Sequence, residues 1–277
     1  LLIRVSTLLQ ETFGDMPVCR ISDDHFAVMT GIDRHKWQLE DLRKKLKTAG
    51  KGNGVEFHAG IFPEGDGLEP DIITAIDYAR LACSTLRGNH NDFICYYDQK
   101  LMKEHDDRQH VLEFFTQALE EHWIKVFYQP IVCAETGEVC NYEALARWFD
   151  PERGLLSPGI FMPVIENYNL GARMDLYMVE EVCREYDKRK AGGLTPVPVS
   201  LNFCRTDFDQ RDMVMAITEI ADRYEVPHNM LMIEVTESGF SRNAEFLQNQ
   251  IDRFHALGYQ VWMDDFGDGY ASLNVLQ

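Results

Sequence analysis

Acidic and amide side chains stand at or near the ends of successive apolar segments in the second half of the chain. They are Glu143, Asn202, Glu234 and Glu237, followed by the neighbouring pair Asp264 and Asp265. Oxygen ligands of this type suit Mg²⁺ or Mn²⁺, and carboxylates that meet at one point repel each other unless a cation lies between them. Arg147 adds a planar guanidinium that can bind a phosphate through two hydrogen bonds. Together these residues favour metal-assisted chemistry on a phosphate ester.

The pair Asp264 and Asp265 can share a site only where a strand ends, because neighbours on a strand point to opposite faces. The glycine-containing segment Phe266–Gly269 follows directly and would let both carboxylates turn toward one point. Two cations about 3.5 to 4 Å apart there would promote in-line attack of water on a phosphodiester. Each of these residues alone is better explained as a helix cap, a turn residue or a solvated charge. The prediction rests on four successive strands that each carry an oxygen ligand.

An alternation of strand and helix patterns explains how residues so distant in sequence converge. The predicted strands are Val126–Val132, Asn141–Arg147, Pro198–Phe203, Leu231–Val235 and Gln260–Met263. The predicted helices are Ile160–Asn167, Met174–Lys190, Met213–Tyr224 and Ala244–Leu257. Such alternation is typical of an α/β fold with mostly parallel strands, whose C-terminal ends lie on one face. Five strands fall short of the eight of a closed barrel, so the sequence leaves open a smaller sheet or a chain that stops early.

The first hundred residues follow a separate pattern of helices and strands. Helices are predicted at Leu1–Phe13, Gln38–Thr48 and Asp71–Leu86, strands at Val55–Phe62 and Asp92–Tyr97, and a hairpin joins Val18–Ile21 to Phe26–Met29. The charged stretch Glu104–Arg108 lies in a predicted helix that continues to Glu121. We place the domain boundary at this stretch, which gives domains of residues 1–105 and 106–277.

Composition restricts the class of function. The chain has 277 residues, of which 45% are hydrophobic and 26% charged, enough for two globular domains. Its formal net charge of -18 argues against sequence-independent binding to long nucleic acids, although a small phosphate ligand remains compatible. Seven scattered cysteines without CxxC pairs favour reduced thiols and a cytoplasmic location. Neither a signal peptide nor a membrane-spanning segment is predicted.

Local motifs around the candidate residues closely resemble those of the EAL-domain family. They are Tyr128-Gln129-Pro130-Ile131, Glu143-Ala144-Leu145-Ala146-Arg147-Trp148, Phe161-Met162-Pro163-x-x-Glu166, Leu201-Asn202, Glu234-Val235-Thr236-Glu237-Ser238, and the segment from Asp264 to Leu273. The resemblance runs from about Lys125 to Gln277, in the family's order. It implies a TIM-type (β/α) barrel, incomplete at its end in this chain. It also implies hydrolysis of cyclic di-GMP to linear pGpG with two Mg²⁺ or Mn²⁺ ions.

The resemblance also assigns roles to individual residues. It implies metal binding by Glu143, Asn202, Glu234 and Asp264, with Asp265 at the second metal. It implies nucleotide and phosphate binding by Gln129, Leu145 and Arg147, with Pro163 and Glu166 as the wall and support of the site. Glu237 matches a residue of the loop network around the metals, so the expected catalytic set is Glu143, Glu237 and Asp265.

Two departures from the family pattern bear on activity. Asp268 stands where threonine is usual and Ala271 where serine is usual. In the family that loop couples metal binding to dimerisation, so the resemblance implies a homodimer through this domain. The added charge of Asp268 is expected either to weaken catalysis or to change its response to metal. The sequence ends at Gln277, before the family's lysine-containing strand and its later acidic residues.

The first half resembles the later part of the GGDEF diguanylate cyclase family, with a degenerate signature. The segment Arg20–Phe26 lies where the signature hairpin belongs, but Ser22 and Asp23 replace both glycines and His25 replaces the glutamate. Glycine there lets a phosphate approach the backbone, and side chains would obstruct it. We therefore expect a domain that lacks cyclase activity and serves as a regulatory or dimerisation module.

Three functions remain open from the sequence. The leading one is a cyclic di-GMP phosphodiesterase. A second is a catalytically inactive receptor, in which Gln129 and Arg147 hold the nucleotide without turnover. A third is a protein-interaction scaffold that does not bind the nucleotide. The lysine-containing strand would discriminate the first two, since its presence in the full protein favours an enzyme and its replacement favours a receptor.

Overall fold

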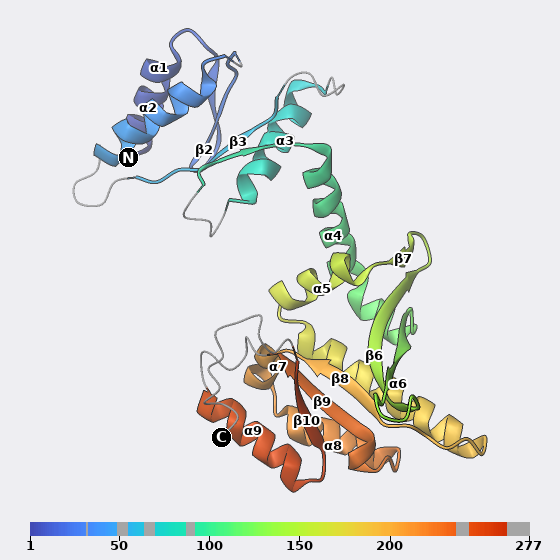
Figure 1. The fold of residues 1–277 in the computed structure, drawn as a ribbon. Helices are drawn as coiled ribbons and strands as arrows, with labels where there is room; N and C mark the ends of the chain where they lie inside the picture. Colours follow the sequence, from blue (N-terminus) through green and yellow to red (C-terminus); the bar gives the residue numbers. More distant parts are fainter. Residues whose placement is uncertain (32, 49–54, 64–69, 87–91, 237–243, 265–277) are drawn as a thin grey trace. The chain divides into compact units, whose positions relative to one another are not determined.

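The computed structural model describes the chain except for residues 32, 49–54, 64–69, 87–91, 237–243 and 265–277 (Figure 1). The chain divides into two compact units, Leu1–Asp106 and Asp107–Gln277. Each unit has its own hydrophobic core, so each is described by itself. Among the helices that the structure describes, none has the length and apolar character needed to cross a lipid bilayer.

The first unit contains two small sheets and three helices within its described residues. Its elements are α1 (Leu2–Phe13), β1 (Val18–Ser22), β2 (His25–Val28), α2 (His35–Thr48), β3 (Ala59–Ile61), α3 (Ile72–Ser84) and β4 (Ile94–Tyr96). Strands β1 and β2 form the predicted antiparallel hairpin, and β3 pairs parallel with β4. The predicted strand Val55–Phe62 is shorter than expected, because only Ala59–Ile61 finds a partner strand.

The second unit begins within the long helix α4 (Gln99–Glu120), which confirms the predicted continuous helix. Its other elements are β5 (Ile124–Val132), β6 (Val139–Asp150), β7 (Gly154–Leu156), α5 (Pro158–Asn167), α6 (Gly171–Ala191), β8 (Val199–Phe203), α7 (Arg205–Gln210), α8 (Met213–Arg223), the 3₁₀ helix η1 (His228–Met230), β9 (Leu231–Thr236), α9 (Ala244–Ala256) and β10 (Gln260–Asp264). The five predicted strands and four predicted helices are all present, whereas β7 and α7 were not predicted.

The strands of the second unit form a mixed sheet in the order β10-β9-β8-β6-β5, with β7 paired to β6. Strands β6, β8, β9 and β10 run parallel, as the alternation predicts. Strand β5 differs, because it pairs antiparallel with β6 from Ile124 opposite Trp148 to Val132 opposite Val139. The connection is a short turn with Gly137 at φ 72°, and without a crossover helix the chain can only reverse direction.

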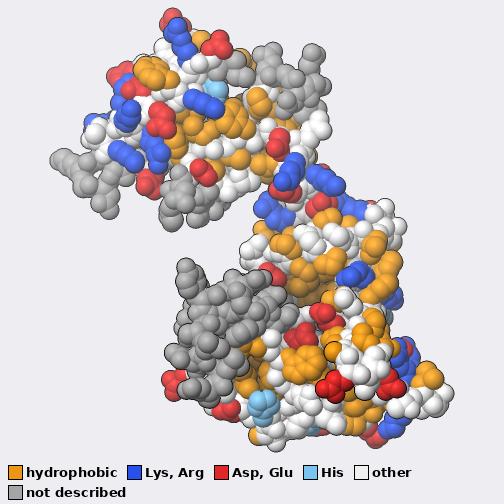
Figure 2. Space-filling model, viewed as in Figure 1, with side chains coloured by type: hydrophobic (Ala, Val, Ile, Leu, Met, Phe, Trp, Pro, Cys, Tyr) orange, Lys and Arg blue, Asp and Glu red, His pale blue; other side chains and the backbone are white. Residues whose placement is uncertain are grey.

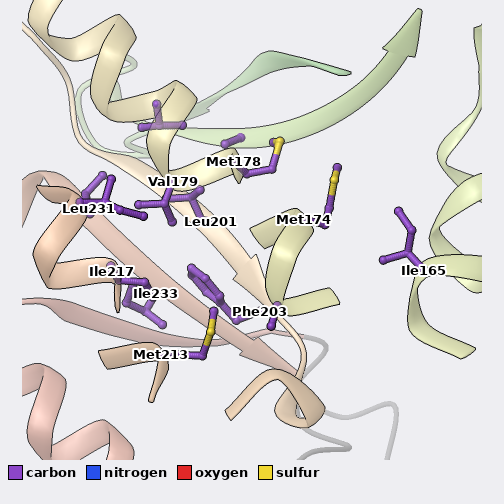
Figure 3. Packing of buried hydrophobic residues seen from close by; sticks show 14 of the residues in the cluster. Ile165, Met174, Met178, Val179, Leu201, Phe203, Met213, Ile217, Leu231 and Ile233 are labelled. Atoms are coloured by element: carbon purple, nitrogen blue, oxygen red, sulfur yellow. The ribbon is translucent and has the colours of Figure 1, made fainter. Parts of the chain in front are cut away.

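A continuous apolar core fixes this sheet against its helices. Figure 3 shows Met178 and Val179 of α6 beside Leu201 and Phe203 of β8, with side chains of α8 and β9 nearby. Leu201, Phe203 and Val179 are at most 2% exposed. A one-residue slip of a strand would turn its buried side chains to the other face, so the core determines the register. The register in turn determines which polar residues meet at the C-terminal ends of the strands.

Candidate active site

The side chains of Glu143 and Asn202 meet between strands β6 and β8. Glu143 lies opposite Ser200 in the parallel pairing, and Asn202 follows Ser200 by two residues on the same face. The Asn202 amide donates a hydrogen bond from Nδ2 to Oε1 of Glu143 at 2.8 Å. This bond uses the amide nitrogen, so Oδ1 of Asn202 keeps its lone pairs beside the Glu143 carboxylate. Hard divalent cations bind oxygen ligands of this kind.

Glu234 and Asp264 continue the series across the sheet. Glu234 of β9 is paired with Asn202 of β8, and its residue is only 7% exposed. On the next strand Trp262 is paired with Glu234, which places Asp264 two residues further along β10, opposite Thr236. The backbone therefore brings four predicted metal-binding positions to neighbouring strands. The side chain of Asp264, and residues Glu237 and Asp265, lie outside the part that the structure describes.

The predicted nucleotide-binding residues lie on one face of the β5–β6 hairpin. Side chains alternate along a strand, so Glu143, Leu145 and Arg147 share the face of β6 opposite to the buried Ala144 and Trp148. Gln129 lies directly opposite Glu143 on β5. The Arg147 guanidinium donates from Nη1 to the carbonyl of Ala146 at 2.8 Å. A ligand on this face would meet a cation, an amide and an apolar side chain together.

Pro163 and Glu166 come from helix α5 and not from the sheet. Both are exposed, whereas Phe161 on the same helix is buried and packs against Trp148 at 5.7 Å between ring centroids. The Glu166 carboxylate accepts a weak hydrogen bond from the Cys204 thiol, with Sγ to Oε1 at 3.9 Å. Cys204 directly follows β8, so Glu166 contacts the segment that carries Asn202.

A pair of interacting acidic residues next to this contact was not predicted. Asp207 of α7 is 1% exposed and accepts the N–H of Cys204 on Oδ2 at 2.9 Å. Desolvation and the negative charge of Asp207 raise the pKa of Asp175 on α6 well above its ordinary value, and desolvation also raises the pKa of Asp207. A Cβ on Gly171 would lie 2.3 Å from Oδ1 of Asp207, so a larger residue at the start of α6 would force this carboxylate to move.

A second unpredicted pair joins helix α4 to the end of β6. His110 Nε2 lies 2.6 Å from Oδ2 of Asp150, and both side chains are buried. Burial favours the neutral acid, but hydrogen bonds from His110 and from the N–H groups of Glu152 and Arg153 lower the pKa of Asp150. A histidine on a helix and an aspartate 40 residues later give no sequence signal, because only the fold brings them together.

The described donors fit a divalent cation by chemistry. Within the described residues, no three or more His, Cys, Asp and Glu side chains are grouped closely enough to hold a metal ion. Glu143, Glu234 and Asn202 nevertheless supply two carboxylates and an amide from neighbouring strands, and all three offer oxygen. Oxygen donors without thiolate or imidazole favour Mg²⁺ or Mn²⁺ over Zn²⁺.

The chain matches the model of a known protein family. The family model described as the EAL domain matches residues 113–277, which is more than half of the chain. This span begins within α4 and includes every site residue predicted from the sequence.

Two similar proteins come from Pseudomonas aeruginosa. The chain is 30% identical over 183 residues to the bifunctional diguanylate cyclase/cyclic di-GMP phosphodiesterase MucR of Pseudomonas aeruginosa, which covers 66% of this chain and 27% of MucR. It is 28% identical over 269 residues to the cyclic di-GMP phosphodiesterase NbdA of the same organism, which covers 94% of this chain and 34% of NbdA. The chain thus spans about a third of the length of these relatives.

Solved structures give the same fold. A MucR phosphodiesterase structure in complex with c-di-GMP matches with a TM-score of 0.56 and 32% identity, over 60% of this chain and 68% of that chain. The helix-GGDEF-EAL part of Vibrio cholerae LapD matches with a TM-score of 0.56 over 99% of this chain and 65% of that chain. Its identity is 16%, so this second likeness concerns the fold alone.

Proposed function

The chain belongs to the EAL-domain family, and from this premise we propose that it hydrolyses cyclic di-GMP to linear pGpG with the help of divalent cations. The observation that carries the proposal is the contact between Glu143 and Asn202, on a face of the sheet that also presents Arg147. Relatives described as cyclic di-GMP phosphodiesterases support the choice of substrate.

In this proposal one group of residues holds the cations. Glu143, Asn202, Glu234, Asp264 and Asp265 would hold two Mg²⁺ or Mn²⁺ ions. Such ions supply activation of water and neutralise the charge that develops on the phosphodiester. The Asn202 amide holds the Glu143 carboxylate in one orientation through its 2.8 Å hydrogen bond, and Glu237 would support the loop beside them.

The nucleotide would lie along the β5–β6 hairpin. Arg147 would bind a phosphate through its guanidinium, since a planar fork of donors matches two phosphate oxygens. Gln129 would donate to or accept from the ligand, Leu145 would provide apolar contact, and Pro163 would form part of the wall. The alternation on β6 places Leu145 and Arg147 on the same side as Glu143, so one ligand can reach all three.

Product analysis tests the activity directly. The intact protein is incubated with cyclic di-GMP and Mn²⁺, and the products are separated by chromatography. We expect pGpG from the wild type and at least about 100-fold less from Glu143→Gln, because even outer partners of metal ligands cost 10- to 100-fold when mutated. Glu135→Gln changes an exposed glutamate in the β5–β6 turn and serves as the matched control.

The same experiment separates the enzyme from a receptor. If cyclic di-GMP is not hydrolysed but binds saturably in calorimetry, the enzyme hypothesis is wrong. The protein would then be a receptor that uses the same face of the hairpin. The absence of both turnover and binding would leave a protein-interaction scaffold.

For the first unit we propose a degenerate GGDEF domain with a regulatory role. The hairpin supports this reading, since Asp23 adopts φ 28° at a position where glycine would be expected. The Arg20 side chain donates a hydrogen bond to the Asp23 carbonyl, with Nε to oxygen at 2.8 Å. This backbone carbonyl of the turn is therefore already engaged. Incubation of the intact protein with GTP and Mn²⁺ is expected to yield no cyclic di-GMP, and its appearance would refute this assignment.

A further inference from the structure

Two exposed aromatic rings lie together on the β5–β6 hairpin. Phe127 of β5 is 48% exposed and Phe149 of β6 is 41% exposed. Their ring centroids are 5.9 Å apart with an interplanar angle of 23°, a stacked arrangement. Figure 2 shows hydrophobic side chains at the surface over the β6–β7 region. Large aromatic side chains are usually buried, so an exposed stacked pair needs a reason.

The strand register places this pair beside the proposed site. Phe127 is paired with Leu145 and is two residues from Gln129, which is paired with Glu143. Phe149 is two residues beyond Arg147 on the same face of β6. One strand face thus carries, in order, the carboxylate, the apolar residue, the cation and an aromatic ring.

Among the described residues, the buried core does not include these rings. The opposite face of the same strands supplies the core, since Ile124, Ala144 and Trp148 are at most 6% exposed and belong to the buried cluster. The Arg147 guanidinium lies 5.9 Å from the Phe127 ring centroid, so the cation and the aromatic surface form one combined feature. A ligand that joins an anionic phosphate to a flat ring matches this combination.

We propose that Phe127 and Phe149 form a stacking shelf for one purine base of the dinucleotide while Arg147 binds its phosphate. The inference rests on the proposed function and adds to it a specific contact for the base. Base–aromatic stacking tolerates any π face, so the shelf would contribute affinity, with hydrogen bonds elsewhere reading the guanine edge. By this reasoning the two phenylalanines are substrate-positioning residues that act on binding and not on the chemical step.

The test separates stacking from packing through three kinds of variant. Phe127→Leu and Phe149→Leu retain apolar volume but lose the ring. Phe149→Trp retains a ring that can stack. Val132→Ala changes an exposed residue on β5 outside the face and is the control. Binding of cyclic di-GMP is measured by calorimetry in EDTA, turnover is measured with Mn²⁺, and circular dichroism melts verify folding.

We expect the leucine variants to bind about 5- to 100-fold more weakly, with a matching rise in KM and little change in kcat. Phe149→Trp and Val132→Ala should remain close to the wild type. Leucine variants with wild-type affinity and KM would overturn the shelf, and so would a loss of kcat at unchanged KM, which would indicate a disturbed metal site. If the wild type neither binds nor hydrolyses cyclic di-GMP, the proposed function itself fails, and this result is distinct from the other two.

Discussion

The Asn202 side chain joins two strands at the proposed metal site. Its amide nitrogen donates to Glu143, and in the proposed site its oxygen would bind a cation. We expect Asn202→Ala to raise the Mn²⁺ concentration needed for half-maximal activity about 10- to 100-fold, since it removes both a ligand and an orienting bond. The Mn²⁺-induced rise in melting temperature should shrink in parallel. Asn229→Ala, at an exposed position of η1, should leave both measurements unchanged.

Asp175 and Asp207 provide a residue-scale test that does not depend on catalysis. The folded pKa of each acid is raised, so the fold favours a protonated pair. Stability from such a group is fully present below the unfolded pKa of about 3.9 and is lost as the pH rises through the folded pKa, at about 1.4 kcal/mol per pH unit within that window.

Asp175→Asn should therefore become progressively more stable than the wild type as the pH rises from 5 toward the folded pKa. Asparagine supplies a permanent neutral donor to Asp207 and avoids the cost of ionisation. Melting temperatures at several pH values give the comparison, with the exposed Asp187→Asn on the same helix as control. A constant difference across this pH range would mean that Asp175 ionises normally in the folded protein.

At the scale of single residues, the sequence predicted the candidate metal ligands but not the side chains that contact one another around them. Glu143, Asn202 and Glu234 were predicted to converge, and the register brings their positions to adjacent strands. The sequence did contain a signal for the stacked ring pair. Phe127 is two residues from Gln129 and Phe149 is two residues from Arg147, so each ring lies on the same strand face as a predicted nucleotide-binding residue. The burial of Asp207 and His110 could not, since it depends on contacts between distant elements.

At the scale of elements, helix α4 is attached to the β6–β7 hairpin by two contacts that involve carboxylates. His110 binds Asp150 inside the core, and Arg153 Nη1 lies 2.9 Å from Oδ1 of Asp107. The lowered pKa of Asp150 means that its stabilising contribution is present above its unfolded pKa and is lost as the pH falls through the folded value. Acid should therefore loosen α4 from this hairpin.

Removal of the histidine tests this attachment. His110→Ala leaves the Asp150 carboxylate buried with fewer donors, and we expect a loss of about 3 kcal/mol in the free energy of unfolding by urea. The double variant His110→Ala/Asp150→Ala should lose much less than the sum of the single changes, because neither side chain is then left buried without its partner. Additive losses would show that the two side chains do not interact. Lys103→Ala, exposed on the same helix, is the control.

Long, strongly patterned elements of the second unit were predicted well, whereas its short elements β7 and α7 were not. Strand β7 has three residues and exists only through its pairing with β6, and α7 has six residues with too few positions to show a helical period. The antiparallel β5–β6 pairing had a sequence signal in Thr136-Gly137, since glycine permits the positive φ that the turn uses. The parallel order of the remaining strands follows from their crossover helices.

At the scale of the whole molecule, net charge and local charge oppose each other. The chain has a formal net charge of -18, whereas the proposed phosphate contact depends on one arginine. A cyclic dinucleotide carries two negative phosphates, so under the proposed function the acidic chain would repel it at long range and attract it only near Arg147. Salt screens the long-range interaction first, because the Debye length falls from about 30 Å at 0.01 M to about 8 Å at 0.15 M.

The association rate constant of cyclic di-GMP should therefore rise a few-fold between 0.01 and 0.15 M salt, in contrast to a basic nucleotide-binding protein, where salt slows association. Stopped-flow fluorescence with a labelled nucleotide measures this rate. Arg147→Gln should keep the same salt dependence while its dissociation rate increases, since it removes a short-range contact and changes the net charge by only one. An association rate that falls with salt would mean that positive charge around the site outweighs the acidic surface, and the ligand would then be steered by the site's own field.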